Sequence, residues 1–154
     1  MPKLKILIMN GPNLSSLGQR RPDIYGRLGM DALPDLVNRL LGPAKKDIEL
    51  IFFQSNSEGS MIDRLEEAQK QSVDGVVLNA GAYTHTSLAL ADCLEWIGIP
   101  CIEVHLSNVW ARAEEIRHKS LISGKSVGVI AGFGLLSYAL AVQALFQHLT
   151  NGNS

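Results

Sequence analysis

The stretch Ile6-Leu7-Ile8-Met9-Asn10-Gly11-Pro12-Asn13 decides the fold, because an apolar run passes there directly into a polar turn. Residues 76–81 and 101–107 repeat the pattern, and each ends an apolar run in polar side chains. Continuous apolar runs of this length are typical of parallel strands buried on both faces. Ligands bind outside the carboxyl ends of the strands in such sheets. Polar residues at three strand ends therefore predict a functional site, and we expect an enzyme.

Strands and helices are expected to alternate along the chain. The apolar runs predict strands at about residues 4–9, 48–53, 75–79, 100–105 and 126–131. Helical patterns occupy about residues 31–41, 60–71, 86–98 and 135–149. Asp31 can cap the first helix, and Ser60 with Asp63 resembles a capping box for the second. The alternation predicts an α/β fold in which helices cover both faces of a five-stranded parallel sheet.

Length and composition indicate one folded domain over residues 1–154. With 46% apolar residues, 19% charged residues and a net charge of -1, neither disorder nor nucleic-acid binding is indicated. No apolar run approaches the roughly 20 residues of a membrane helix, and no cleavable signal precedes the first strand. Cys93 and Cys101 lack metal or redox spacing and are expected to be reduced. We therefore predict a cytoplasmic protein without a membrane partner.

A loop at about residues 14–29 is longer than an ordinary connection and carries Pro22 between several glycines, so we expect a lid. Within it, Tyr25 follows Arg20 by five residues. A tyrosine that acts as a base near neutral pH needs its pKa lowered by about two units from ~10, which takes roughly 3 kcal/mol of favourable charge interaction. One desolvated guanidinium can supply this. A solvent-exposed loop tyrosine without a catalytic role is the alternative.

The fourth strand carries a second candidate. Glu103 and His105 alternate along it and should point to the same face, where the carboxylate can orient the imidazole as a general acid. A buried pair without chemistry is the alternative. The turn at residues 106–108 and the helix start at residues 84–87 could each present backbone N–H groups to an anion. In principle His85 could join Glu103 and His105 in a metal site, but paired ligand spacing is absent, as are phosphate-loop motifs.

Several motifs, in this order, resemble the type II 3-dehydroquinate dehydratases from about residue 4 to residue 146. They are Asn10-Gly11-Pro12-Asn13-Leu14, Arg20-x-Pro22-x-x-Tyr25-Gly26, Phe53-Gln54-Ser55-Asn56, Asn79-x-Gly81-Ala82-x-Thr84-His85-Thr86-Ser87 and Glu103-Val104-His105-Leu106-Ser107-Asn108. The resemblance implies a flavodoxin-like three-layer sandwich that needs neither a metal nor a cofactor. It also implies conversion of 3-dehydroquinate to 3-dehydroshikimate and water through an enolate, in the shikimate pathway or in quinate catabolism.

The resemblance also implies roles for five catalytic residues. Tyr25 is the base, and Arg20 keeps it ionised. Asn13 holds a water that stabilises the enolate. His105, oriented by Glu103, protonates the leaving hydroxyl.

Substrate binding follows from the same resemblance. The substrate carboxylate is expected on the backbone N–H groups of Leu106 and Ser107. Asn79, His85 and Arg117 are expected to bind the ring hydroxyls and the carboxylate region. Asp92 matches a residue that reaches the site of a neighbouring subunit, because members of this family assemble as dodecamers built from trimers.

Three departures from the family pattern affect these expectations. One extra residue stands between His105 and Arg117, which leaves Arg112 as the other candidate for the substrate-binding arginine. Ala91 and Ala80 replace an arginine and a proline that are common in relatives. The alternatives left open are a flavodoxin-like hydrolase that uses His105 and Glu103 on a bound water, and a catalytically silent relative that binds quinate-like acids or serves only in assembly.

Overall fold

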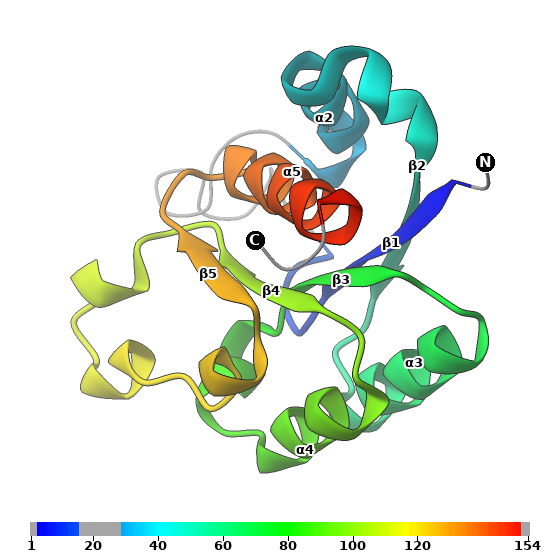
Figure 1. The fold of residues 1–154 in the computed structure, drawn as a ribbon. Coiled ribbons are helices and arrows are strands. Elements are labelled where there is room, and N and C mark those ends of the chain that lie inside the picture. Colours follow the sequence, from blue (N-terminus) through cyan, green and yellow to red (C-terminus); the bar gives the residue numbers. More distant parts are fainter. Residues whose placement is uncertain (1–2, 16–28, 152–154) are drawn as a thin grey trace.

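Five parallel strands form one sheet in the computed structural model, which describes residues 3–15 and 29–151 (Figure 1). The strands are β1 (Leu4–Asn10), β2 (Ile48–Gln54), β3 (Gly75–Asn79), β4 (Cys101–His105) and β5 (Gly128–Ala131). Their spatial order is β2-β1-β3-β4-β5, which is the flavodoxin-like order of an α/β fold. The five expected strands and the fold class are thus confirmed.

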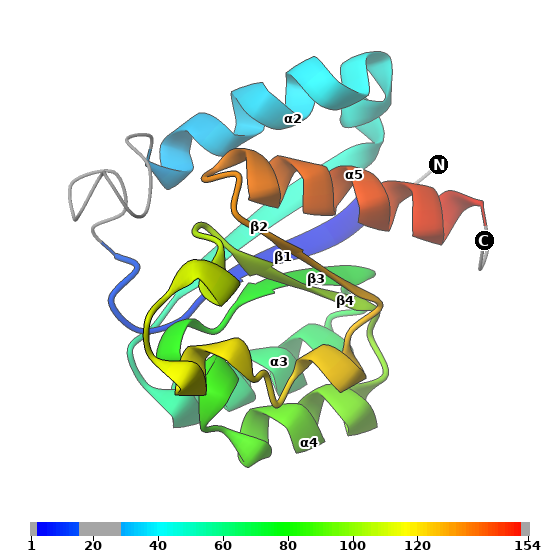
Figure 2. The same cartoon turned by 90° about the vertical axis from the view of Figure 1, so that its left-hand side faces the viewer.

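Helices cover both faces of the sheet, as expected for strands that are apolar on both sides. The helices α2 (Leu33–Leu41) and α5 (Leu136–Thr150) lie on one face, and α3 (Glu58–Lys70) and α4 (Leu88–Ile97) lie on the other (Figure 2). Each face has its own apolar core: Ile6 and Ile8 point toward α2 and α5, whereas Leu7 and Met9 point toward α3 and α4. This alternation along β1 produces the three-layer sandwich.

The helix starts differ in part from the sequence-based expectations. Ser57, not Ser60, caps α3: its Oγ accepts a hydrogen bond of 3.2 Å from the Ser60 N–H, so the expected capping box is wrong. Asp31 caps no helix, because it lies inside the 3-10 turn η1 (Met30–Ala32) that precedes α2. Ser87 does cap α4, and its Oγ accepts a hydrogen bond of 2.9 Å from the Leu90 N–H.

Short 3-10 turns occupy the connections that the hydrophobic pattern left without regular structure. They are η2 (Gly42–Asp47), η3 (Gly81–His85), η4 (Val109–Ala111), η5 (Glu115–His118) and η6 (Ser123–Lys125). Three of these turns, η4, η5 and η6, lie between β4 and β5. Among the residues that the structure describes, no helix is long and apolar enough to cross a membrane.

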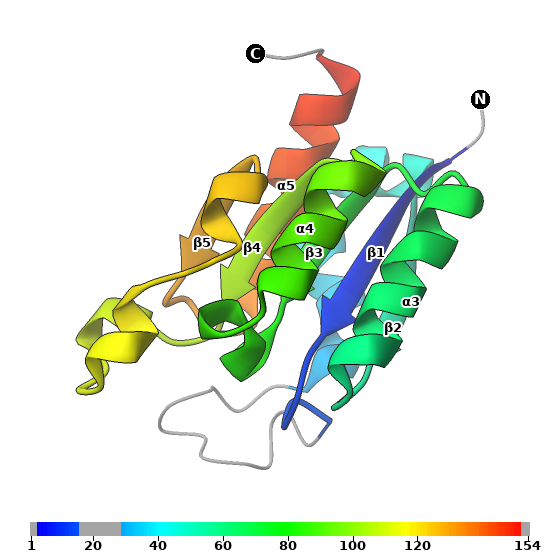
Figure 3. The same ribbon diagram turned by 90° about the horizontal axis from the view of Figure 1, so that it is seen from below.

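The register of the strands brings polar residues to one edge of the sheet. On β1, Asn10 pairs with Gln54 of β2 on one side and with Asn79 of β3 on the other. From β1 the chain first adds β2 on one side and then β3 on the other side, so the strand order changes direction between β1 and β3. Ligands bind at this point in folds of this kind. Figure 3 shows β1 and β4 running toward the same end of the sheet.

Candidate active site

A pocket opens at the carboxyl ends of β1, β3 and β4. Its wall comes from three segments: the turn after β1, the turn after β3 with η3, and the segment after β4. The lining residues are Pro12, Asn13, Leu14, Asn79, Gly81, Ala82, His85, His105, Leu106, Ser107, Val109, Arg112 and Arg117. The sequence predicted a site at this edge, and the pocket lies there.

The turn after β1 is held against its neighbours by close backbone contacts. A Cβ atom at Gly11 would lie 2.5 Å from the Ala80 carbonyl oxygen, so only glycine fits there. Asn13 follows with a φ of 67°, a left-handed conformation that asparagine tolerates better than most residues. Its backbone N–H donates a hydrogen bond of 3.0 Å to Oδ1 of Asn56, beyond the end of β2. The residues after β2 thus position Asn13 at the pocket.

An uncharged hydrogen-bond network lies beneath the pocket. The Tyr138 hydroxyl, from α5, donates to Asn10 Oδ1 at 2.5 Å and accepts from Asn79 Nδ2 at 2.8 Å. Oδ1 of Asn79 in turn accepts the Gly81 N–H at 3.1 Å. Tyr138 is fully buried, and this burial raises the pKa of its hydroxyl although the bond from Asn79 opposes the shift. The phenol therefore stays neutral, and the Gly81 N–H, which can only donate, fixes Oδ1 as the end of the Asn79 amide that faces it.

A carboxylate and an imidazole meet at the end of β4. His105 Nε2 lies 2.5 Å from Glu103 Oε2, and the two residues are only 6% and 2% exposed. The expectation that both side chains share one face of the strand is confirmed. Burial alone would raise the pKa of the Glu103 carboxyl, but hydrogen bonds from His105, Ser123 and Ser120 outweigh it and hold that pKa below its usual value. Glu103 is thus a buried carboxylate at neutral pH.

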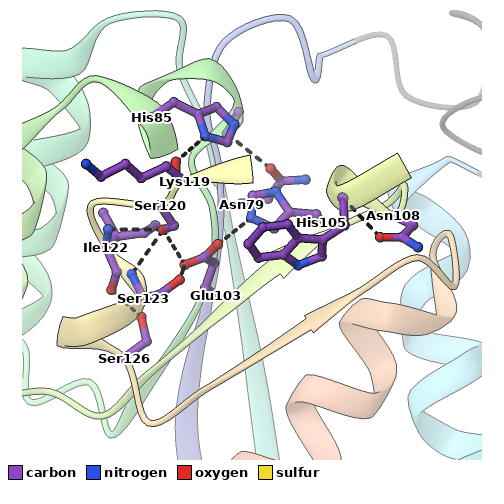
Figure 4. A network of polar contacts seen from close by, with 12 residues as sticks. Asn79, His85, Glu103, His105, Asn108, Lys119, Ser120, Ile122, Ser123 and Ser126 are labelled. Atoms are coloured by element: carbon purple, nitrogen blue, oxygen red, sulfur yellow. Dashed lines mark hydrogen bonds and ion pairs between the residues drawn. The ribbon is translucent and has the colours of Figure 1, made fainter. Parts of the chain in front are cut away.

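His85 lies beside this pair on η3. Its Nδ1 is 2.7 Å from the Lys119 carbonyl oxygen, which can only accept, so Nδ1 carries a proton. The rings of His85 and His105 are stacked with their centroids 6.4 Å apart (Figure 4). The fixed Nδ1–H leaves Nε2 of His85 as the nitrogen that can meet a ligand. The pocket therefore holds two imidazoles whose orientations are set by different partners.

Two arginines at the pocket have different partners. The Arg117 Nε atom donates to Glu114 Oε2 at 2.7 Å, in an exposed pair that is worth little in stability. Nη1 of Arg112 lies 3.5 Å from Ser107 Oγ, and the Arg112 carbonyl oxygen accepts from His118 Nε2 at 2.6 Å. Both guanidinium groups give the pocket positive charge suited to an anionic ligand, so the structure keeps both candidates from the sequence.

The residues predicted as site residues divide into three groups. Seven line the pocket: Asn13, Asn79, His85, His105, Leu106, Ser107 and Arg117. Glu103 lies behind His105, and Asp92 is exposed on α4 and does not line the pocket. Arg20 and Tyr25, with most of the expected lid, fall within residues 16–28 and lie outside the described residues.

Sequence reasoning missed the residues that support the site from behind. Tyr138 orients Asn79, Asn56 holds the turn at Asn13, and Ser120 and Ser123 bind Glu103. Only Asn56 belongs to a motif that stood out in the sequence. A buried tyrosine on an apolar helix face and serines in an irregular loop carry no periodic signal that could mark them.

The conjectured metal set is not assembled. Among the described residues, no three His, Cys, Asp or Glu side chains form a group that could hold a metal ion. Glu103 Oε2 and His105 Nε2 face each other at 2.5 Å, a hydrogen-bond distance that leaves no space for an ion between them.

Comparisons with known proteins agree on one family. The family described as "Dehydroquinase class II" matches residues 4–146. A 3-dehydroquinate dehydratase from Exiguobacterium sp. is 50% identical over 148 residues, which cover 96% of this chain and 98% of that protein. Among solved structures, type II dehydroquinase from Butyrivibrio crossotus superposes with a TM-score of 0.84 at 43% identity, over 94% of this chain and 98% of that one. The enzyme of the same type from Propionibacterium acnes gives 0.80 at 40% identity, with 94% and 97% covered.

Proposed function

This chain belongs to the class II dehydroquinase family, and we propose that it carries out the family reaction with the residues gathered at the carboxyl ends of β1, β3 and β4. It is a 3-dehydroquinate dehydratase, a hydro-lyase of the shikimate pathway. The reaction breaks a C–H bond beside the ketone and the C–O bond of a hydroxyl on the next carbon, and a conjugated double bond and water result. No electrons are gained or lost. The protein must therefore supply a base, an acid and a way to stabilise an enolate.

The acid is His105, and its buried pair with Glu103 is the observation that carries this proposal. The imidazole lines the pocket on one side and meets a carboxylate on the other. A cation that forms on the ring is stabilised by this carboxylate, so the ring can take up a proton and release it to a leaving hydroxyl. General acids placed in this way contribute about 10²- to 10⁴-fold to a rate.

The base is Tyr25, with Arg20 keeping it as tyrosinate. Both residues stand in the sequence spacing typical of the family, in a loop that joins the turn after β1 to η1. Leu14, which lines the pocket, precedes both residues in the sequence. Asn13 would hold a water against the enolate oxygen, since its left-handed turn lies at the pocket wall.

The substrate is anionic, and the remaining lining residues suit it. We infer that its carboxylate rests on the backbone N–H groups of Leu106 and Ser107, which line the pocket directly after β4. Asn79 and His85 would bind ring hydroxyls. Arg117 would bind near the carboxylate, and Arg112, beside Ser107, is the second candidate for that contact.

The domain, its location and its assembly complete the proposal. We infer one dehydroquinase-type domain over residues 1–154 with a lid at about 14–29, located in the cytoplasm and acting without a cofactor. Twelve copies would assemble from trimers, and Asp92 would reach a neighbouring site, a role open to it because it is exposed on α4. The same chemical step also occurs in quinate breakdown.

The test is a substrate assay. Adding 3-dehydroquinate to purified protein should produce the ultraviolet absorbance of the conjugated product. Tyr25→Phe should nearly abolish turnover while leaving the circular dichroism spectrum unchanged, because the hydroxyl is the proposed base. A metal chelator should not change the rate.

Each outcome decides something different. No absorbance change from well-folded protein would refute the dehydratase proposal and favour a silent relative or a hydrolase. Substantial activity of Tyr25→Phe would assign the base to another residue, and loss of rate on chelation would restore a metal site.

A further inference from the structure

Glu103 receives three hydrogen bonds, and two come from a loop that the proposed mechanism does not use. Ser120 Oγ lies 2.8 Å from Glu103 Oε1, and Ser123 Oγ lies 2.6 Å from the same atom. The other carboxylate oxygen meets His105 Nε2. Figure 4 shows the serines on one side of the carboxylate and the imidazole on the other. Both carboxylate oxygens are therefore occupied in a position that is 2% exposed.

The direction of the Ser120 bond follows from its other partners. Ser120 Oγ accepts the backbone N–H groups of Ile122, at 3.1 Å, and of Ser123, at 3.0 Å. A hydroxyl has two acceptor sites and one proton to donate. Because both acceptor sites are filled by backbone donors, the Ser120 proton must point to Glu103. The backbone of the loop thus fixes Glu103 Oε1 as an acceptor.

This arrangement determines the protonation of the histidine. A carboxylate that accepts from the serines on one oxygen is favoured in its ionised form, which has no proton to give. Its other oxygen must then accept from His105, so Nε2 of the imidazole carries a proton. Nδ1 is left as the nitrogen that exchanges a proton with a ligand in the pocket. The choice between the two ring nitrogens of His105 is thereby made by serines that follow Glu103 by 17 and 20 residues in the sequence.

We propose that Ser120 and Ser123 are positioning residues, which hold Glu103 as an oriented acceptor and so set the tautomer and ring orientation of His105. The catalytic consequence rests on the proposed function, in which His105 is the general acid. Their role is distinct from stabilising the loop alone, because the effect passes through Glu103 to the imidazole.

Other titratable groups around Glu103 do not take over this role. On β4 itself, burial first and the Glu103 charge to a smaller extent raise the pKa of the Cys101 thiol to about 12. Cys93, on α4 in the same layer, has its pKa raised to about 11 by burial and by the charge of Glu66. Both thiols are therefore neutral in an ordinary assay.

The remaining charged groups lie on the pocket side. His85 on η3 stacks on His105, and Arg112 and Arg117 line the pocket. Among the residues that the structure describes, no acidic side chain lines it. His118 on η5 is hydrogen-bonded to the Arg112 carbonyl oxygen. Lys125 on η6 is paired with Glu95 at 3.1 Å. Changes that result from removing a serine hydroxyl can thus be assigned to Glu103 and His105.

Ser123→Ala is the sharpest test, because Ser123 Oγ donates to Glu103 whereas Ser120 also satisfies two backbone groups. Ser126→Ala is the matched control: this hydroxyl lies in the same loop but donates to the Ile122 carbonyl oxygen at 2.9 Å. Ser123→Thr keeps the hydroxyl and should restore the wild-type behaviour. The two readouts are the ¹⁵N chemical shifts of the His105 ring and the pH dependence of kcat and KM.

In the wild type, the neutral His105 ring should show a protonated Nε2. In Ser123→Ala the pKa of Glu103 should rise, so the acidic limb of the kcat profile should move to higher pH. We expect kcat to fall on the order of tenfold, because loss of a group that orients a functional histidine typically costs about 10- to 100-fold. KM should change less than about twofold, because neither serine lines the pocket. Ser126→Ala should match the wild type in both readouts.

A wild-type ring protonated at Nδ1 in its neutral form would overturn the inference, even if the variant failed to fold. So would a folded Ser123→Ala with unchanged ring shifts and an unchanged pH profile. The nuclear resonance readout needs no turnover, so absence of wild-type activity would refute the proposed function and leave the assignment of the serines to be decided by the ring shifts.

Discussion

Two polar networks meet at the same edge of the sheet and differ in charge. The network at the ends of β1 and β3 joins Asn10, Tyr138 and Asn79 and is uncharged, with a phenol whose pKa is raised by burial. The network at the end of β4 joins Glu103 and His105, and the carboxyl pKa is lowered there by hydrogen bonds that outweigh burial. The first can fix the position of a ligand, whereas only the second can move a proton at neutral pH.

The difference has a physical origin in the number of donors. A buried carboxylate stays ionised only if donors replace the water it has lost, and Glu103 has three. Tyr138 meets two amide side chains, which satisfy a neutral hydroxyl fully and give no reason to ionise it. Changes in the charged network should therefore affect turnover most, and changes in the uncharged network should affect stability most.

The largest expected effect is on turnover in His105→Ala. Removing the proposed acid should lower kcat by about 10²- to 10⁴-fold. The variant should still fold, and circular dichroism would check this. A kcat within threefold of the wild type would remove the functional distinction between the two networks.

Tyr138→Phe should chiefly lower stability. The change leaves Asn10 Oδ1 and one Asn79 N–H without their buried partner, which should cost about 1–3 kcal/mol in the free energy of unfolding by urea. Tyr83→Phe is the control, because its hydroxyl bonds the Asn56 carbonyl oxygen near solvent and should cost less than about 1 kcal/mol. Equal losses in the two variants would show that the buried network contributes nothing special.

The stability of the protein at alkaline pH tests whether the buried layer around Glu103 excludes water. Burial raises the pKa of Cys101 from 9.0 to about 12, so the stability linked to this neutral thiol is fully present below pH 9 and is lost as pH rises through 12. Between pH 9 and 10 the loss should be about 1 kcal/mol. Cys101→Ala should remove this part of the pH dependence in urea unfolding, and an unchanged slope would indicate a thiol open to solvent.

Acidic pH should produce the smallest effect. Because the pKa of Glu103 is lowered in the fold, the stability it contributes is present above its unfolded value, 4.5, and is lost as pH falls through its folded value. Wild type should therefore lose stability below about pH 4.5 more steeply than Glu103→Gln. Glu114→Gln is the control, since Glu114 pairs with Arg117 at the surface and should scarcely change the curve. If the stability of wild type and of Glu103→Gln fell in parallel with pH, Glu103 could not be an ionised carboxylate in the folded protein.

Sequence periodicity predicted the architecture because the relevant information is local. A strand buried on both faces is apolar in its buried part, and Ile6–Met9 and Gly75–Leu78 are apolar and are each followed by an asparagine. Glu103 and His105 meet because alternate residues of a strand share a face. These features depend on neighbours within a few positions, so the chain alone specifies them.

Long-range contacts decided what the sequence pattern could not. Tyr138 and Asn10 are 128 residues apart, and their bond depends on how α5 crosses the sheet. On α5, Leu136 is 38% exposed whereas Tyr138, two residues later, is fully buried. The helix rotation is set by packing against the sheet, which no periodicity within one helix can determine.

The sequence by itself determined the order of strands and helices, the polar strand ends and the side-by-side placement of Glu103 and His105. Tertiary structure alone decided that Ser120 and Ser123 reach Glu103 and that Arg112 and Arg117 both line the pocket. The reason is that regular elements follow from local steric and hydrophobic rules, whereas an irregular loop takes its shape from the surface on which it folds.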